Sequence, residues 1–132
     1  MRLALLVSAV ALVACDSGPV IATADLSLRT DRTAYAIGDD VQLTFANDSA
    51  VDVALNSPLP CSATFEQRVG DAWTPVALPI ACFGVVVPVP AGERTAATVR
   101  LEDVAPGTYR FRAWPSVGER QDEVISPTVT VH

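Results

Sequence analysis

From residue 25 onward, hydrophobic and polar residues alternate along short segments that turn-forming residues separate. In segment 41–47, Val41, Leu43 and Phe45 alternate with polar or small residues, which is the pattern of a strand with one buried face. No segment after residue 15 shows a sustained helical period. The pattern predicts an all-β domain with strands at 25–30, 41–47, 51–56, 63–69, 72–78, 84–89, 94–101, 108–114 and 123–131.

Turn chemistry supports these boundaries. Gly70-Asp71 lies between two predicted strands and suits a tight hairpin. Pro106-Gly107 precedes segment 108–114, in which Arg110 and Arg112 lie on the face opposite to that of the aromatic residues. Evenly spaced short strands of this kind are typical of a sandwich or a barrel.

The first residues follow a different pattern. A nearly unbroken apolar run occupies residues 3–14 and is preceded by one positive residue, Arg2. A permanent membrane-spanning helix needs about 20 apolar residues. This run is shorter and has the length of a signal-peptide core.

The residues that end the run, Leu12-Val13-Ala14-Cys15, resemble the lipobox of bacterial lipoproteins. The resemblance implies that residues 1–14 are a lipoprotein signal peptide and that Cys15 becomes the acylated first residue of the mature protein, bearing palmitate or a similar chain. Several acyl chains on one cysteine make a durable anchor, because a single chain binds membranes only marginally. The alternative is an ordinary signal peptide that is cut near Ala14.

The same resemblance predicts where the protein resides: lipid-anchored on the cell membrane, facing the periplasm or the cell exterior. In enterobacterial lipoproteins an aspartate in the position of Asp16 favours retention in the inner membrane. Residues 15–24 then form a tether that reaches at most about 30 Å when extended. The tether leads to a single domain at 25–132.

Net charge limits the partners of this domain. The chain carries a formal charge of −6, and all its Lys or Arg positions are arginines. An acidic surface repels phosphate backbones, so we expect no nucleic acid among the partners. The membrane, through the lipid on Cys15, and an envelope protein are the partners that remain.

The chain has three cysteines, an odd number for an exported protein. Assignment of Cys15 to lipid leaves Cys61 and Cys82, for which a disulfide is favoured in an oxidising envelope. In the chain-entropy model such a bond would contribute on the order of 3 kcal/mol to stability. The alternative, a catalytic thiol, needs a nearby base, and the only histidine is His132, the last residue.

Two segments resemble bacterial immunoglobulin-like domains. Tyr35-Ala-Ile-Gly-Asp39 followed by the alternating residues 41–49 is similar to the opening of these domains, and Pro106-Gly-Thr-Tyr109 is similar to the approach to their penultimate strand. The resemblance implies an antiparallel immunoglobulin-like β-sandwich of about seven to nine strands, with Tyr109 as the tyrosine of a tyrosine corner.

A narrower likeness is to the BsuPI type of bacterial proteinase inhibitor. It rests on Phe65-Glu66, Gly70-Asp-Ala-Trp73, Pro90-Ala-Gly-Glu93 and Pro106-Gly-Thr-Tyr109. The likeness implies a proteinase-inhibitor function, with loop 57–62 or 79–83 as the inhibitory segment. This chain departs from that family in its predicted export, lipid anchor and disulfide.

The residue types argue against catalysis. Hydrolases that use a serine or cysteine nucleophile need a base, and this chain has one terminal histidine and no lysine. Transition metals need clustered His, Cys or Met, so we expect no metal site and no cofactor. Calcium would need the fold to gather aspartates; the alternative is that these residues end solvated turns. The candidates are Asp39, Asp40, Asp48 and Asp103.

Three large side chains are candidate partner-binding residues: Trp73, Phe83 and Trp114. Phe83 opens an apolar run, 83–87, which is either a partner-binding edge or an ordinary strand whose prolines prevent edge pairing. The tryptophans are alternatively core or rim residues of the sandwich. The sequence thus predicts a non-enzymatic binding or structural module of the envelope, with a BsuPI-like inhibitor and a carbohydrate- or calcium-binding module as alternatives.

Overall fold

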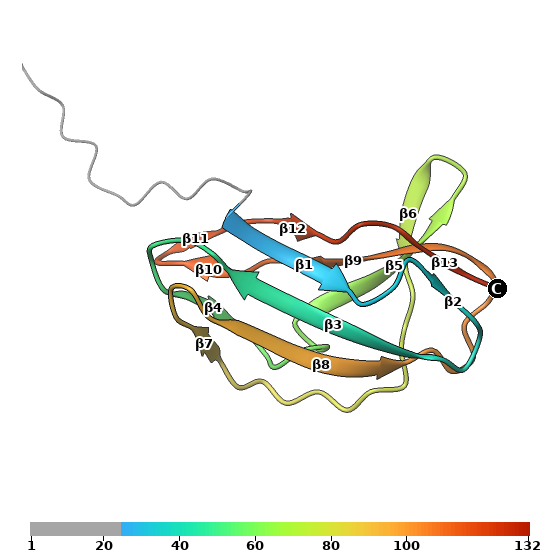
Figure 1. Ribbon diagram of the computed structural model, residues 1–132, viewed down its shortest axis with the longest axis horizontal. Coiled ribbons are helices and arrows are strands. Elements are labelled where there is room, and N and C mark those ends of the chain that lie inside the picture. The colour runs from blue at the N-terminus through green and yellow to red at the C-terminus, as the bar shows by residue number, and fades with distance from the viewer. Residues whose placement is uncertain (1–24) are drawn as a thin grey trace, which may run out of the picture.

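The computed structural model describes residues 25–132, and this part of the chain is built from strands without an α-helix (Figure 1). The longer strands are β1 (Leu26–Thr30), β3 (Asp40–Asn47), β5 (Ala63–Val69), β6 (Ala72–Pro75), β8 (Arg94–Arg100) and β9 (Gly107–Ala113). The shorter strands are β2 (Ala34–Tyr35), β4 (Val53–Leu55), β7 (Val87–Val89), β10 (Ser116–Val117), β11 (Arg120–Gln121), β12 (Val124–Ile125) and β13 (Val129–Val131).

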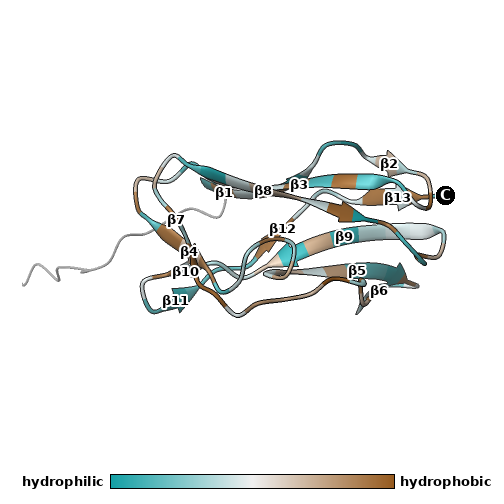
Figure 2. Ribbon diagram, turned by 90° about the horizontal axis from the view of Figure 1, so that it is seen from below, coloured by the Kyte–Doolittle hydropathy of each residue, from teal (hydrophilic) through white to brown (hydrophobic). Residues whose placement is uncertain are grey.

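These strands form a β-sandwich. The first sheet has the order β1-β3-β8, and the second has the order β2-β13-β9-β5-β6 with β12 also on β9. Figure 2 shows β3 and β8 in one layer and β9, β5 and β6 in the other. A small end sheet, β11-β10-β4-β7, lies at one end of the sandwich (Figure 2).

The strand order confirms the predicted fold class. β1, β3 and β8 are neighbours in the order of immunoglobulin strands A, B and E, and β5, β9 and β13 are neighbours in the order C, F and G. All pairings are antiparallel except that of β2 with β13. The strands outnumber the expected seven to nine because segment 123–131 is broken at Ser126–Pro127 and three two-residue strands form where the sequence does not alternate.

The core lies between the two main sheets and contains the residues that the alternation predicts. Val41, Leu43 and Phe45 of β3 are fully buried. On the facing sheet, the Phe65 ring stacks on Tyr109 with centroids 4.6 Å apart, and it meets the Phe111 ring at 4.9 Å. Burial of such aromatic side chains supplies a large share of the stabilising area in a small domain.

A tyrosine corner closes the turn before β9, as the family resemblance implies. The buried Tyr109 hydroxyl donates a hydrogen bond to the carbonyl oxygen of Ala105, at 2.5 Å. Burial also raises the pKa of Tyr109, so the phenol stays protonated and remains a donor.

Asn47 joins the first sheet to the end sheet. Its side-chain amide nitrogen donates to the carbonyl oxygens of Val51 (2.8 Å) and Val89 (2.9 Å), and its Oδ1 accepts from the Ser49 hydroxyl at 2.6 Å. Asn47 is completely buried, and its bonds to Val89 and Ser49 are buried as well. The turn after β3 is therefore fixed by one side chain.

The predicted hairpin at Gly70-Asp71 is confirmed. Val69 pairs with Ala72 across a two-residue turn, and Gly70 has a φ of 62°. A glycine in this first turn position is the signature of the type II′ hairpin turn.

The prediction for segment 84–89 is largely wrong, because only Val87–Val89 pairs as a strand. Residues 79–86 are all exposed and take part in no sheet. The apolar run of Phe83 to Val87 reads as a buried strand, but Pro79 and Pro88 flank it with residues that cannot donate to a ladder. Strand β6 likewise ends at Pro75 rather than at residue 78.

Candidate binding surfaces

A disulfide joins Cys61, just before β5, to Cys82, as predicted. Their Cα atoms lie 5.6 Å apart, within the usual span of such bonds. Cys82 belongs to the connection between β6 and β7, which runs along one edge of the sandwich (Figure 1). The bond therefore holds the middle of that long connection against the body of the domain.

We refer to the exposed residues 79–86 as the apolar loop. Phe83 is 71% exposed, Val86 65% and Val85 60%, which makes these the most exposed large apolar side chains of residues 25–132. No charged residue occurs between Asp71 and Glu93. A continuous apolar segment that is exposed on the surface of a domain is a mark of an interaction site.

The loop is held at both ends and in the middle. Val76 and Leu78 pack against the core on one side, and Val87 packs against it on the other. The backbone hydrogen bonds of the loop are local, from Ile80 N to Leu78 O and from Val85 N to Phe83 O, both 2.8 Å. The loop therefore presents apolar side chains on a backbone that is fixed but not paired with a strand.

The two candidate tryptophans lie in one row on the outer face of the second sheet. The Arg110 guanidinium sits 4.2 Å from the centre of the Trp73 ring, and the Arg112 guanidinium sits 4.7 Å from the centre of the Trp114 ring. Phe83 belongs to the apolar loop and does not join this row. We call the set of Trp73, Arg110, Glu66, Arg112 and Trp114 the arginine–tryptophan row.

Glu66 occupies the centre of the row, and no local pattern in the sequence marks it for this role. Glu66 is only 1% exposed; its Oε1 accepts a hydrogen bond from Arg110 Nε at 2.9 Å, and its Oε2 forms an ion pair with Arg112 Nη2 at 2.9 Å. Arg112 also lies 3.5 Å from Glu123. Each guanidinium is thus neutralised by a carboxylate and stacked on an indole, which describes a structural network rather than an open site.

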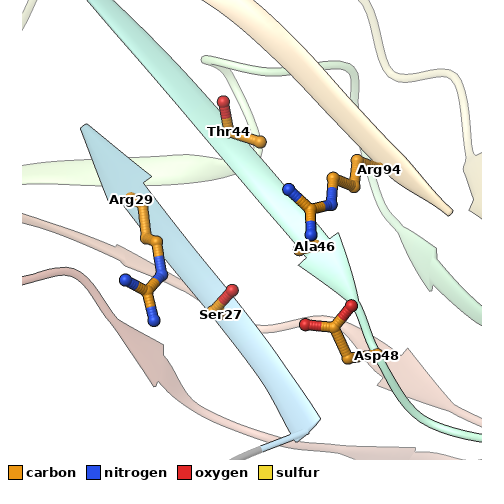
Figure 3. A pocket seen from close by; sticks show the side chains of 6 residues that line it. All are labelled: Ser27, Arg29, Thr44, Ala46, Asp48 and Arg94. Carbon is orange, nitrogen blue, oxygen red and sulfur yellow. The ribbon is translucent and has the colours of Figure 1, made fainter. Parts of the chain in front are cut away.

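The outer face of the first sheet carries a depression of about 320 Å³ (Figure 3). Its floor is made of small side chains, because Ser27 and Thr44 face outward and Ala46 pairs with Ser27 across β1 and β3. Its rim is charged. The residues that line it are Ser27, Arg29, Thr44, Ala46, Asp48 and Arg94.

Register explains why two arginines meet over this floor. Arg29 pairs with Thr44, and Arg94 of β8 pairs with Ala46, so the two long side chains stand diagonally across β3. In Figure 3, Arg94 reaches over β3 while the Asp48 carboxylate points toward it from the end of the same strand. Neither Arg29 nor Arg94 forms an ion pair with any carboxylate of residues 25–132.

The acid nearest to Arg29 along the chain is held elsewhere. Asp31 Oδ1 accepts hydrogen bonds from the Tyr35 hydroxyl at 2.7 Å and from the backbone N–H of Gln42 at 2.9 Å. Burial raises the pKa of the Asp31 carboxyl, but these hydrogen bonds outweigh burial and hold the pKa below its usual 3.8. Asp31 is therefore ionised and bound to its own partners instead of neutralising Arg29.

A second, more open groove of about 520 Å³ follows the free edge of β1. It is lined by Leu26, Ser27, Leu28, Arg29, Ile125, Ser126 and Pro127, so it adjoins the depression at Ser27 and Arg29.

Of the candidate calcium ligands, Asp48 is not brought together with Asp39 and Asp40. Asp39 and Asp40 lie at the start of β3, whereas Asp48 follows its end. Asp39 Oδ2 accepts from the Ala36 amide at 2.8 Å and lies 3.5 Å from Arg32. Across residues 25–132, no group of three or more His, Cys, Asp or Glu side chains is arranged to hold a metal ion.

Three predictions concern the N-terminal region. The signal peptide at 1–14, the acylation site Cys15 and the tether at 15–24 lie outside the described residues. Within the described part of the chain, no helix is long and apolar enough to cross a membrane.

No protein-family model and no curated protein matches this chain. An alkylpurine DNA glycosylase from Pseudomonas fluorescens, bound to DNA with an abasic site analogue, is 12% identical over 82% of this chain, with a TM-score of 0.40. A β-glucosidase from Listeria innocua, in complex with glucose, is 19% identical over 80% of it, with a TM-score of 0.36. The matches cover 30% and 16% of those two chains, and at these TM-scores they carry no argument about function.

Proposed function

We propose that this protein is a non-enzymatic binding module of the bacterial cell envelope, anchored to the membrane through lipid on Cys15, which engages a protein partner with the apolar loop. The observation that carries the proposal is the exposure of Phe83, Val85 and Val86 on a loop that the Cys61–Cys82 disulfide holds in place.

The physical argument is preorganisation. Ordering a flexible loop at an interface costs roughly 0.5–1.5 kcal/mol for each immobilised side chain. Here the disulfide and the half-buried anchors Leu78 and Val87, which pack against the core, restrict the loop before any partner arrives. A large aromatic side chain that is fixed in this way is the usual centre of a binding hot spot.

The proposal for a non-enzymatic role rests on the chain's chemistry. The sole imidazole is that of His132. The backbone of His132 forms hydrogen bonds with Tyr35 and Ile37, at β2 and just after it, and not with the apolar loop. Within the arginine–tryptophan row, both arginines form ion pairs with Glu66. What remains open on the surface is suited to binding.

Site-specific photocrosslinking in intact cells tests the proposal. A benzophenone amino acid in place of Val86 is expected to capture a discrete protein adduct, and Phe83→Ser in the same chain is expected to abolish that adduct. Val69 on the β5–β6 hairpin is the matched control, because it is exposed and apolar but lies outside the loop. Equal adducts from positions 69 and 86, or an adduct that Phe83→Ser leaves unchanged, would contradict the proposal.

The anchor is tested separately. Intact-mass measurement of the membrane-extracted protein is expected to show a chain that begins at Cys15 and carries acyl groups, and Cys15→Ser is expected to release the protein from the membrane fraction. A mature chain with an unmodified thiol at Cys15 would rule the anchor out while leaving the loop's role intact.

A second candidate function, inhibition of an endopeptidase, is favoured by the position of Phe83. It follows the disulfide-bonded Cys82 directly, and most of its side chain is free. Endopeptidases bind an extended, unpaired segment by adding it to a strand edge, with side-chain pockets that give specificity. An inhibitor would slow at least one protease in a panel, Phe83→Asp would remove that effect, and Val69→Asp would not; no inhibition of any protease would dismiss this candidate.

A further inference from the structure

The depression on the first sheet is distinct from the apolar loop, and its chemistry indicates a different ligand. It brings together two guanidinium groups, Arg29 and Arg94, that make no ion pair within the part of the chain that the structure describes. The rest of the molecule is acidic, with a formal net charge of −6 for the whole chain. Two cations that face one cavity and form no ion pair favour an anionic ligand in such a protein.

The floor adds donors that suit a tetrahedral anion. The hydroxyls of Ser27 and Thr44 line the depression, and neither makes a side-chain hydrogen bond with residues 25–132. Each guanidinium offers five N–H donors in a planar fork, the geometry that binds phosphate oxygens in pairs. Since Ala46 is small, a phosphate group has room between the two arginines.

Asp48 gives the site a second, opposite charge. Its backbone N–H donates to the Asp25 carbonyl at 2.8 Å, which fixes the residue at the end of β3, while its carboxylate stays exposed at the rim. Two cations with one anion at the edge are complementary to a group that carries a phosphate and, a few bonds away, an amine.

We propose that this depression binds a phosphoethanolamine group, and that its source is the headgroup of a membrane phospholipid. Arg29, Arg94 and the two hydroxyls hold the phosphate, and Asp48 accepts hydrogen bonds from the ammonium. The assignment to lipid rests on the proposed anchor at Cys15, because Ser27 lies just beyond the tether and a tether of that length keeps it within about 30 Å of the bilayer. The binding chemistry itself does not depend on the anchor.

Titration of the full chain in a phosphate-free, non-ionic detergent tests the binding chemistry with water-soluble probes. Glycerophosphoethanolamine is expected to saturate the site, and glycerophosphoglycerol, a phosphodiester that lacks the amine, is expected to bind less tightly. Arg29→Gln and Arg94→Gln are each expected to weaken binding about tenfold or more, since each removes charge-assisted hydrogen bonds. Asp48→Asn is expected to erase the preference for the amine and to leave phosphate binding in place.

Arg100→Gln is the matched control. Arg100 lies on β8, on the same face as Arg94, but it forms an ion pair with Glu102 at 3.2 Å. Its affinity for glycerophosphoethanolamine is expected to equal that of the parent. The proposal is overturned if the parent shows no saturable binding, or if Arg29→Gln and Arg94→Gln bind as the parent does.

Chemical labelling in vesicles tests the source of the group. Phenylglyoxal modifies exposed arginines, and peptide mapping reports the rate at each position. In phosphatidylethanolamine vesicles Arg29 and Arg94 are expected to react more slowly than in phosphatidylcholine vesicles, with Arg100 unchanged. Equal rates in both lipids, or failure of the protein to associate with either kind of vesicle, together with a positive titration, would overturn the lipid source.

Discussion

The two faces of the sandwich each carry a pair of arginines, and the pairs are used in opposite ways. On the second sheet, Arg110 and Arg112 share one buried carboxylate and lie against indole rings. On the first sheet, Arg29 and Arg94 border a depression and make no ion pair among residues 25–132. The same side chain is a structural element on one face and an open donor on the other.

The difference follows from what stands opposite each arginine. Arg110 pairs across the strands with Glu66, and Arg112, two residues further along β9, pairs with Thr64 and reaches Glu66 diagonally. Arg29 pairs with Thr44, and Arg94 pairs with Ala46, so no carboxylate stands opposite either of them. Cross-strand neighbours therefore decide whether a surface arginine stabilises the sheet or stays free to bind.

Removal of the shared carboxylate should have the largest effect. Glu66→Gln leaves the partly buried Arg110 without an anion and Arg112 with only the half-exposed Glu123, so we expect a loss of about 3–5 kcal/mol in the free energy of unfolding. Chemical denaturation under non-reducing conditions measures it. The control is Glu123→Gln, because Glu123 is half exposed and its loss should cost at most about 1 kcal/mol. Similar costs for the two variants would mean that the row is not a buried network.

Replacement of an indole should have the next largest effect. Trp73→Leu keeps an apolar side chain but removes the ring under Arg110, and we expect a loss of roughly 1–2 kcal/mol. Phe83→Leu serves as a comparison, since Phe83 is an exposed aromatic residue without a stacked cation and its replacement should change stability by less than about 0.5 kcal/mol. Thermal unfolding followed by circular dichroism would rank the two.

A smaller effect is expected on the stability of the domain at acid pH. The folded-state pKa of Asp31 is depressed, so its stabilising contribution is present above the ordinary value of 3.8 and is lost as pH falls through the folded-state pKa. Asp31→Asn should therefore flatten the fall in stability below that pH and leave its pH dependence near neutrality unchanged. Unfolding curves at pH 2.5, 3.5 and 7 would show this, and a variant with the same acid profile as the parent would disprove it.

The open arginines should matter least for stability. The double variant Arg29→Gln/Arg94→Gln breaks no ion pair with the described residues, so we expect unfolding free energy within about 0.5 kcal/mol of the parent. The same variant abolishes the binding proposed for the depression. A large loss of stability instead would show that these side chains are structural, and the contrast between the two faces would fail.

Local patterns in the sequence predicted much of the fold. Alternation located most strands, Gly70 marked the hairpin turn, and the family likeness marked Tyr109 as the corner tyrosine. These features depend on neighbouring residues or on a short motif. The disulfide was predictable because the choice of partners for Cys61 and Cys82 was small.

The sites were harder to predict because they depend on register between distant strands. Glu66 becomes a buried partner only when β5 aligns with β9, and the depression exists only when β8 aligns with β3 so that Arg94 faces Ala46. The apolar run at Phe83 shows a second limit, since composition alone does not reveal that no neighbouring strand covers it.

The long uncharged stretch that contains the apolar loop has a consequence for proteolysis. Between Arg68 and Arg94 the chain offers no peptide bond that trypsin recognises. Complete non-reducing digestion therefore leaves peptides 33–68 and 69–94 linked as one species through Cys61 and Cys82. Proteases that cut after basic residues would leave the loop whole, whereas those that cut after large apolar residues find Phe83 within reach.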